Sequence, residues 1–514
     1  MSFFFLERNL LLPGIAAPKT AADPPSFSLR LHLYKLRKPA LIAVLCWAAF
    51  WPTLGAGFMI DDPFLLRAVQ YEPGLTLKGV VSDLTDNVHK EPGMFYYRPL
   101  QGLMVRLEYS LWGEKAFWYH ALSLLFHSAN AVLLLLLLSA LGLEPALALG
   151  AACLFAVNPV IIDDLFAATG GESMANFFLL STLLLLLKNR RRAALLLSLP
   201  AVFAKESNIV LPALAALCFA FQGRPRRDYV RLLWLLPICA LFLALRQFYI
   251  NSPPILSAAP AIKFFFMLLP RLISHYLRVL LLPLDLETWP AVFHISTFWP
   301  LFLLIAAAAV RALFLLPAPR RLTAFCLCWF LLLLAPRVPA VMATQVMMDK
   351  WVFMASPAVF VLLLFWLFRF RENPRPWVRA LPWTVIAAAV FCWSAVAHAE
   401  ARLRGSDEKN YRWTIRNGPR TFASYRLGLI LIRGGRAGEA VETLRPLAAE
   451  FPDNADFQNA FAMALWHSGD RREAWDLMKE LAGRYPANRS IQENADRMRT
   501  MLPPTGDNGP NRGR

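Results

Sequence analysis

The sequence predicts an all-α, polytopic membrane protein with a polar helical domain at its C-terminal end. Of its 514 residues, 57% are hydrophobic and only 17% are charged, which is more apolar surface than a soluble fold can bury. Uncharged runs such as 131–141 and 177–187 lie inside apolar stretches long enough to cross a bilayer. Because backbone groups in lipid must satisfy their own hydrogen bonds, these stretches are expected to be helices.

The basic residues cluster in short segments between the apolar stretches. On a soluble protein the net charge of +18 would suggest nucleic acid, but here it follows the positive-inside pattern, so no nucleic-acid partner is expected. The clusters are Arg30 to Lys38, Lys188 to Arg192, Arg224 to Arg231, Arg320 with Arg321, and Arg369 to Arg379. Placing all of them in the cytoplasm requires an even number of crossings between neighbouring clusters.

About 11 transmembrane helices satisfy this charge rule. We place them at about 40–58, 116–140, 146–162, 173–187, two in a hairpin within 193–221, 232–250, 296–316, 322–335, 351–368 and 380–398. The apolar stretch 261–283 carries four basic residues, and we interpret it as an interfacial helix because a span there would invert every later basic loop.

The topology predicts a multi-pass protein of a bacterial inner membrane. Residues 1–38 form a basic cytoplasmic tail, residues 39–398 the membrane domain, and residues 399–502 a domain outside the cytoplasm. Residues 503–514 are expected to be disordered because of their composition.

Residues 399–502 contain a repeat with a period of 34 residues. The matching pairs are Leu427 and Phe461, Leu431 and Leu465, Gly435 and Gly469, Ala440 and Ala474, Leu444 and Met478, Phe451 and Tyr485, and Pro452 and Pro486. The pattern resembles two tetratricopeptide repeats followed by a capping helix, with a generic pair of helical hairpins as the alternative. We expect this domain to bind a protein acceptor or partner.

Asp61 and Asp62 directly follow the first predicted span. Two adjacent carboxylates at a membrane exit gain nothing from lipid, which favours a role in chemistry or ion binding. A carboxylate there can act as a catalytic base that deprotonates an acceptor hydroxyl. The alternative is that the pair caps the next helix, with Pro63 in its first turn.

Further polar residues gather in loops predicted to lie on the same side as Asp61. The candidates for binding a donor phosphate or an acceptor are Arg98, Lys205, Glu206, His275, Arg278, Arg337 and Lys350, and the candidate metal ligands are Asp62 and Asp163. Cations or a divalent ion can neutralise a departing phosphate. At a membrane boundary, this chemistry fits sugar transfer from a polyprenyl-phosphate donor.

Several of these residues also have a purely structural interpretation. Asp163 and Asp164 would cap the turn into the span near 173–187, and Arg98 would anchor a loop at the lipid headgroups. Lys205 and Glu206 would neutralise each other at the tip of their hairpin.

Short motifs along the membrane domain occur in an order that points to one family. They are Asp61-Asp62-Pro63, Tyr97 to Leu100, Phe117 to His120 leading to His127 and Asn130, Phe155 to Pro159 followed by Asp163, Ala204 to Ser207, Tyr276 to Leu284, and Met348 to Ser356. This order resembles the GT-C glycosyltransferases, in particular the protein O-mannosyltransferases and the transmembrane-and-tetratricopeptide-repeat O-mannosyltransferases. The resemblance implies a lipid-linked sugar donor, a membrane-embedded site and Asp61 as the base in preference to Asp62.

Three motifs depart from the family pattern. Residues 158–163 lack both histidines of His-Pro-x-His-Thr-Glu, residues 171–174 replace Gly-Arg-x-Asp, and Asp349-Lys350 replaces Glu-Arg. The sugar, the acceptor and the need for a divalent metal therefore stay open.

Two other classes of function compete with the transferase. One is a ligase or polymerase of the O-antigen type, which needs arginine and histidine on the far side but no carboxylate after the first span. The other is a non-enzymatic protein, either a membrane-anchored repeat scaffold or a transporter. A transporter would carry ionisable residues near mid-membrane, whereas most of those here lie at the rims.

Overall fold

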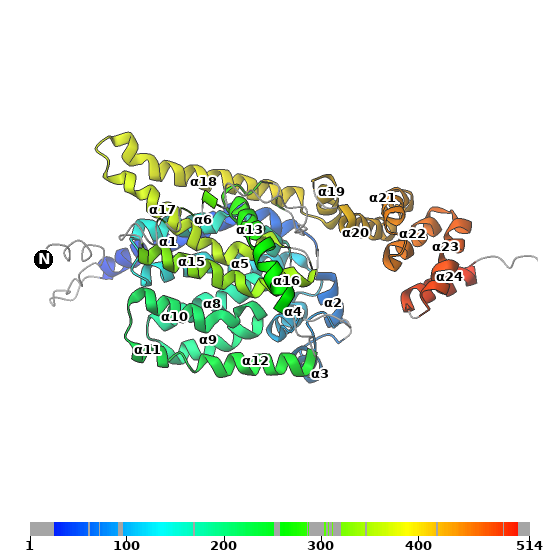
Figure 1. Cartoon of the computed structure of the whole chain (residues 1–514), viewed down its shortest axis with the longest axis horizontal. Helices are drawn as coiled ribbons and strands as arrows, with labels where there is room; N and C mark the ends of the chain where they lie inside the picture. The colour runs from blue at the N-terminus through cyan, green and yellow to red at the C-terminus, as the bar shows by residue number, and fades with distance from the viewer. Residues whose placement is uncertain are drawn as a thin grey trace, which may run out of the picture. The chain divides into compact units, whose positions relative to one another are not determined.

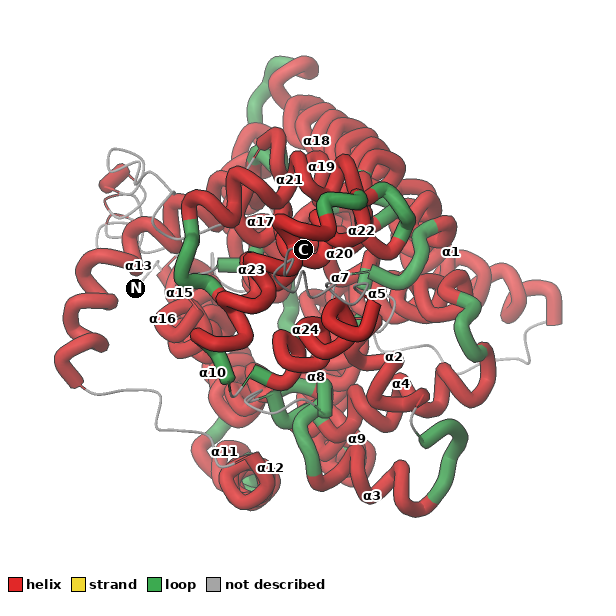
Figure 2. The backbone as a smooth tube through the Cα atoms, turned by 90° about the vertical axis from the view of Figure 1, so that its right-hand side faces the viewer, coloured by secondary structure: helices red, strands yellow, loops and turns green. Residues whose placement is uncertain are grey.

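Every regular element in the described part of the chain is a helix, as Figure 2 shows. The computed structural model describes residues 25–59, 62–70, 72–90, 96–167, 170–250, 258–284, 286, 303–304, 307, 311, 320–344, 347–417, 420–486 and 488–501. The chain forms two compact units, Met1–Gly405 and Ser406–Arg514.

Within the described residues, six helices are long and apolar enough to cross a membrane, so the protein has the character of an integral membrane protein. The six candidate spans are Leu36–Gly55, Ala116–Ala140, Arg226–Ile250, Arg320–Val341, Asp349–Glu372 and Pro376–Leu403. The second is α5 and the sixth is α18, and the first combines α1 (Pro25–Phe50) with η2 (Trp51–Gly55) and the third α11 (Arg226–Val230) with α12 (Leu235–Ile250). The fourth contains α15 (Arg320–Leu334), η7 (Ala335–Arg337) and most of α16 (Val338–Thr344), and the fifth contains η8 (Asp349–Ala355), α17 (Ser356–Leu367) and η9 (Phe368–Glu372). A bent pair would add a seventh span, with Pro145–Val157 (α6) meeting Pro159–Phe166 (η3 and α7) at 44°.

Three predicted spans correspond to shorter helices, namely α8 (Gly171–Leu187), α9 (Arg191–Ala204) and α10 (Leu211–Gln222, after η4, Glu206–Val210). Even α8, with 17 residues, is only about 26 Å long, slightly less than a hydrocarbon core of roughly 30 Å. The count of about 11 spans thus depends on these helices and on 296–316, which lies largely outside the described residues. The predicted interfacial stretch lies in α13 (Ala258–Leu281).

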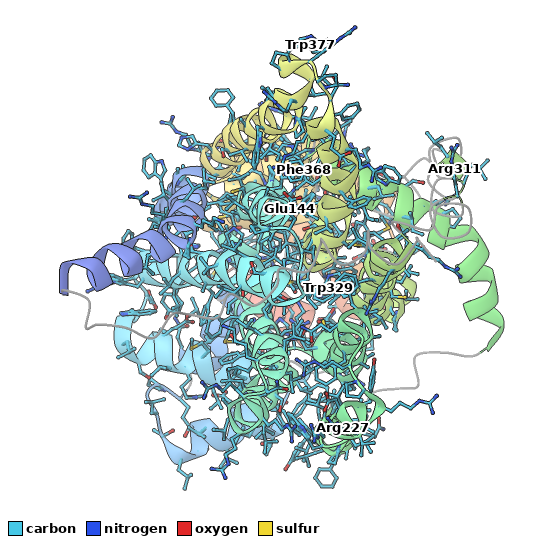
Figure 3. All side chains as sticks on the ribbon, turned by 90° about the vertical axis from the view of Figure 1, so that its left-hand side faces the viewer. Glu144, Arg227, Arg311, Trp329, Phe368 and Trp377 are labelled. Atoms are coloured by element: carbon cyan, nitrogen blue, oxygen red, sulfur yellow. The ribbon has the colours of Figure 1, made fainter. Side chains whose placement is uncertain are left out.

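The basic turns meet at one end of the membrane unit. Arg224 donates to the Leu187 carbonyl at 2.5 Å, and Arg321 donates to the Ala220 carbonyl at 3.1 Å. Figure 3 looks onto this end, where Arg227 projects from the bundle. The opposite end holds α2 (Asp62–Gln70), α3 (Leu77–Thr85) and α4 (Pro99–Trp112), as Figure 1 shows. The predicted cytoplasmic loops therefore share one end, as the charge pattern requires.

A topology reporter fused after Arg371 should read out as cytoplasmic, and one fused after Arg404 as extracytoplasmic, because α18 lies between the two positions. The measurement is the activity of a paired phosphatase and fluorescent-protein reporter. A fusion after Arg224 serves as the control and should match the fusion after Arg371. The reverse pattern would contradict the predicted orientation.

The second unit consists, in its described part, of α19 (Asp407–Asn417), α20 (Arg420–Arg433), α21 (Ala437–Glu450), α22 (Ala455–Ser468), α23 (Arg471–Arg484) and α24 (Arg489–Met501). Repeat positions Leu427 and Phe461 are buried in α20 and α22. Gly435 and Gly469, which follow these helices, have φ angles of 73° and 105°, a left-handed conformation that favours glycine. The period of the sequence thus corresponds to successive helical hairpins, and their assignment as tetratricopeptide repeats stays a prediction.

Candidate functional site

A buried group of charged side chains lies at the end of the membrane unit opposite the basic turns. Its centre is Glu172, in the first turn of α8, which is 4% exposed. The carboxylate accepts hydrogen bonds from Lys205 Nζ and from Arg337 Nη2, the latter at 3.0 Å. Because Lys205 follows α9 and Arg337 ends η7, three helix ends converge on one carboxylate.

A second ion pair lies beside this centre. Arg98, just before α4, donates from Nε and Nη2 to the two carboxylate oxygens of Glu206 at 2.7 and 2.5 Å. Such a bidentate contact fixes both position and orientation. Lys205 bonds to Glu172 instead, so the interpretation of Lys205 and Glu206 as a self-neutralising pair is wrong. Arg98 is also more than a headgroup anchor, since its side chain is only 16% exposed.

Two cations of this group have donors left over. Arg337 Nε is buried without a hydrogen-bond partner. Lys350, in η8, is close enough to Glu172 and Asp164 to influence both electrostatically, yet no described carboxylate forms an ion pair with it. Arg337 Nε is the buried one of these donors, and buried donors are rarely left unsatisfied in native proteins. A bound anion would satisfy both residues.

Asp164 caps the helix that carries Glu172. Its carboxylate accepts hydrogen bonds from the backbone N–H groups of Glu172 and Ser173 at 3.0 and 2.8 Å. This contact confirms the structural interpretation of Asp164. The cap fixes the first turn of α8 and thereby the position of Glu172.

Asp163 points to a different partner, the guanidinium of Arg404 just after α18. Both side chains are buried, with exposures of 4% for Asp163 and 1% for Arg404. Among the residues that the structure describes, no three His, Cys, Asp or Glu side chains form a group able to hold a metal ion. Metal binding by Asp62 and Asp163 stays a prediction.

Asp62 begins α2 and is fully buried. Its Oδ2 accepts a hydrogen bond from the Met59 N–H at 2.9 Å, which closes the turn that leads into the helix. Asp61, the other member of the predicted catalytic pair, lies outside the described residues.

His120 of α5 connects the Asp62 segment with the Asp163 segment. Its Nδ1 lies 3.0 Å from the Leu165 carbonyl, and its Nε2 lies 3.2 Å from the Gly57 carbonyl. Gly57 lies shortly before Asp62 in the sequence, and Leu165 lies shortly after Asp163 within α7. One histidine therefore contacts the backbone of both segments, and this contact keeps Asp62 and Asp163 at the same end of the bundle.

Glu108 of α4 is a buried carboxyl for which no specific role was predicted. It is 5% exposed, and its Oε2 has no hydrogen-bond partner. Burial and the nearby charge of Asp62 raise the pKa of Glu108 well above its usual range. Only the packing of α4 reveals this proximity, because the sequence separates the two residues by a long loop.

His275 and Arg278 were both predicted to bind phosphate or acceptor, but the structure gives them different environments. His275 Nε2 lies 2.6 Å from Asp349 Oδ1, and both side chains are buried. Arg278 is exposed. His275 thus joins α13 to η8, next to Lys350, whereas Arg278 lies at the surface of α13.

Comparisons with known proteins give a limited answer. No family model matches the chain. Over 138 residues the chain is 30% identical to the human protein described as "Protein O-mannosyl-transferase TMTC3". The match covers 26% of this chain and only 15% of that relative. The chain thus spans only a small part of the length of that relative.

Proposed function

We propose that this protein transfers a sugar from a polyprenyl-phosphate donor to a protein or glycan acceptor on the extracytoplasmic side of the membrane. The observation that supports this most directly is the cationic group around Glu172. Arg98, Lys205, Arg337 and Lys350 approach one another from separate helix ends, in a region largely closed to water. Preorganised cations in such a region strongly stabilise the charge that develops on a leaving phosphate.

In the proposed mechanism a carboxylate of the Asp61-Asp62 pair is the general base. It takes the proton of the acceptor hydroxyl while that oxygen attacks C1 of the sugar. The bond between C1 and the phosphate oxygen breaks, and the electron pair stays on the phosphate. Arg337 Nε and Lys350 are assigned to this phosphate because both have donors left over. A divalent ion at Asp62 and Asp163 would be another way to neutralise it.

We assign recruitment of the acceptor to the repeat unit. A groove of about 960 Å³ lies on α21, α22 and α23 and is lined by Arg445, Phe461 and Arg471 among others. Helical repeats commonly use such surfaces to bind extended segments. A membrane-anchored scaffold without catalysis would use the same groove, so activity measurements distinguish the two functions.

A ligase or polymerase of the O-antigen type is the second candidate. The buried His275 beside Asp349, with Arg337 close enough to the neighbouring Tyr276 to act on it electrostatically, favours this possibility. Such an enzyme would not depend on Asp61 or Asp62.

Lys350→Met should raise the KM for the lipid-linked donor by roughly 10- to 100-fold, since a hydrogen bond to a charged group contributes about 1.5–3 kcal/mol. The measurement is steady-state transfer with a polyprenyl-phosphate sugar in proteoliposomes. Lys188→Met removes the same charge from an exposed position at the basic end and should leave the KM unchanged. Equal KM values for both variants would remove Lys350 from the phosphate site.

A further inference from the structure

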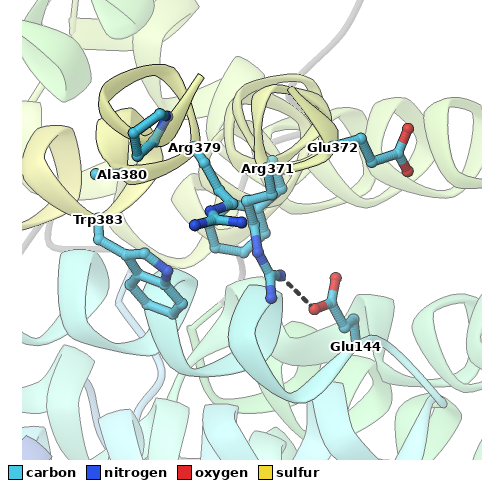
Figure 4. A pocket seen from close by; sticks show the side chains of 8 residues that line it. Glu144, Arg371, Glu372, Arg379, Ala380 and Trp383 are labelled. Carbon is cyan, nitrogen blue, oxygen red and sulfur yellow. Dashed lines mark hydrogen bonds and ion pairs between the residues drawn. The ribbon is translucent and has the colours of Figure 1, made fainter. Parts of the chain in front are cut away.

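A pocket of about 740 Å³ lies at the basic end of the membrane unit, away from the charged group around Glu172. Its walls come from the residue before α6, from η9 and from the first turns of α18, as Figure 4 shows. The lining residues are Glu144, Phe368, Arg371, Glu372, Pro376, Arg379, Ala380 and Trp383. None of them belongs to the proposed transfer site.

Two helix N-termini lie at this pocket. Glu144 is the N-cap residue of α6, and Arg375 is the N-cap residue of α18. In neither helix does the N-cap side chain form a capping hydrogen bond, and each helix begins with a proline, so the N–H groups of the next residues are the ones available. Free N–H groups and the positive end of the helix dipole both favour a bound anion.

The lining combines two arginines (Arg371 and Arg379) and two glutamates (Glu144 and Glu372) with aromatic walls. Arg371 Nη1 donates to Glu144 Oε1 at 2.5 Å, and its guanidinium lies 5.1 Å from the Phe368 ring and 5.9 Å from the Trp383 ring. Figure 4 shows Arg379 beside Arg371. The guanidinium of Arg379 has no ion-pair partner in the described part of the chain, so its charge is available to a ligand.

The surroundings favour a lipid over a soluble anion. In η9, the turn after it and the first turn of α18, four arginines (Arg369, Arg371, Arg375 and Arg379) still outnumber the two carboxylates at the pocket, Glu144 and Glu372. Trp377 is 67% exposed and Trp383 43% exposed beside these cations. Arginine next to exposed tryptophan is typical of the boundary between headgroups and acyl chains.

We propose that this pocket binds the phosphate of an anionic phospholipid from the leaflet that faces the basic turns. Arg379, the remaining donors of Arg371 and the first N–H groups of α18 hold the phosphate, and Trp383 and Phe368 contact the glycerol and the upper acyl chain. Basic pockets between transmembrane helices select anionic headgroups in this way. The bound lipid bridges the start of α18 to the start of α6 and stabilises the turn that joins α17 to α18.

The test uses the purified full-length protein in a neutral detergent, with phosphatidylglycerol, phosphatidylethanolamine and inorganic phosphate as separate probes. We expect phosphatidylglycerol to raise the Tm and to stay bound in native mass spectrometry. The other two probes should have little effect at the same concentration. An equal Tm shift with phosphatidylethanolamine would overturn the preference for anionic lipid. An equal shift with inorganic phosphate would replace the lipid site by a soluble-phosphate site.

Arg379→Gln should weaken phosphatidylglycerol binding by about five- to tenfold, because each basic residue near an anionic headgroup contributes roughly that factor. The residue is exposed, so the variant should keep the Tm of the parent in lipid-free detergent. Arg227→Gln removes the same charge from an exposed position at the same end, outside the pocket, and should bind the lipid as the parent does. Equal weakening in both variants, or in neither, would overturn the pocket as the binding site.

Discussion

Replacing the catalytic base of the Asp61-Asp62 pair with Asn, as Asp61→Asn or Asp62→Asn, should lower sugar transfer by roughly 10²- to 10⁴-fold, the usual contribution of a general base. Asn keeps the size of the side chain, and at position 62 it keeps an oxygen that can accept the hydrogen bond from the Met59 N–H, so folding and insertion should be preserved. The measurement is transfer from a lipid-linked sugar, compared at equal amounts of folded protein. The two single variants, measured in parallel, show which member of the pair is the base, and the resemblance favours Asp61.

Asp228→Asn is a suitable control for this experiment. It also replaces an aspartate by asparagine, but at the basic end of the membrane unit. Asp228 pairs there with Arg231, whose side chain is 44% exposed. Exposed ion pairs contribute little, so activity should persist. Full activity in the Asp61→Asn and Asp62→Asn double variant would eliminate the carboxylate mechanism and favour the ligase or the scaffold.

Glu172→Gln should strongly destabilise the membrane unit. The substitution leaves Lys205 and Arg337 without their shared anion, and both cations lie in a buried region, with side-chain exposures of 5% and 11%. Breaking a buried ion pair by removing one partner costs about 3–5 kcal/mol. The measurement is the Tm of the detergent-solubilised protein, together with the yield of folded protein.

Glu114→Gln provides the matched comparison within the same unit. Glu114 is an exposed carboxylate that accepts a hydrogen bond from Gln70 at 2.8 Å. Its neutralisation should change stability by no more than about 0.5 kcal/mol, as is usual for surface substitutions. If both glutamine variants had the same Tm as the parent protein, Glu172 would not be the centre that holds the two cations.

The long membrane helices could be predicted from the sequence, whereas the shorter ones could only be suggested. The residues of α5 form a 25-residue stretch without a charged side chain, and such a long apolar stretch is typical of a transmembrane helix. The helices α8, α9 and α10 are shorter than a typical span, and their role depends on packing against one another, which composition does not encode. The repeat in the second unit could be predicted because residues 34 positions apart occupy equivalent packing positions.

The members of the charged group were predictable, but their partners were not. Lys205 and Glu206 are neighbours in the chain, so the sequence made them the natural pair. In the structure Lys205 bonds to a residue 33 positions away, and Glu206 to one 108 positions away. Glu172 was overlooked as a centre because its importance arises only where α8, α9 and η7 converge. Sequence spacing determines neighbours on one helix, whereas tertiary packing determines these partners.

The buried ion pair between Asp163 and Arg404 also determines where the protein can be divided. Arg404 is the second-last residue of the membrane unit, which ends at Gly405. A chain cut before Arg404 would remove the guanidinium from Asp163, which adjoins the cap of α8 at Asp164. A chimaera that carries a different C-terminal domain should therefore be joined after Arg404, so that Asp163 keeps its buried cation. The boundary between the two units at Gly405 therefore lies beyond the end of α18 at Leu403.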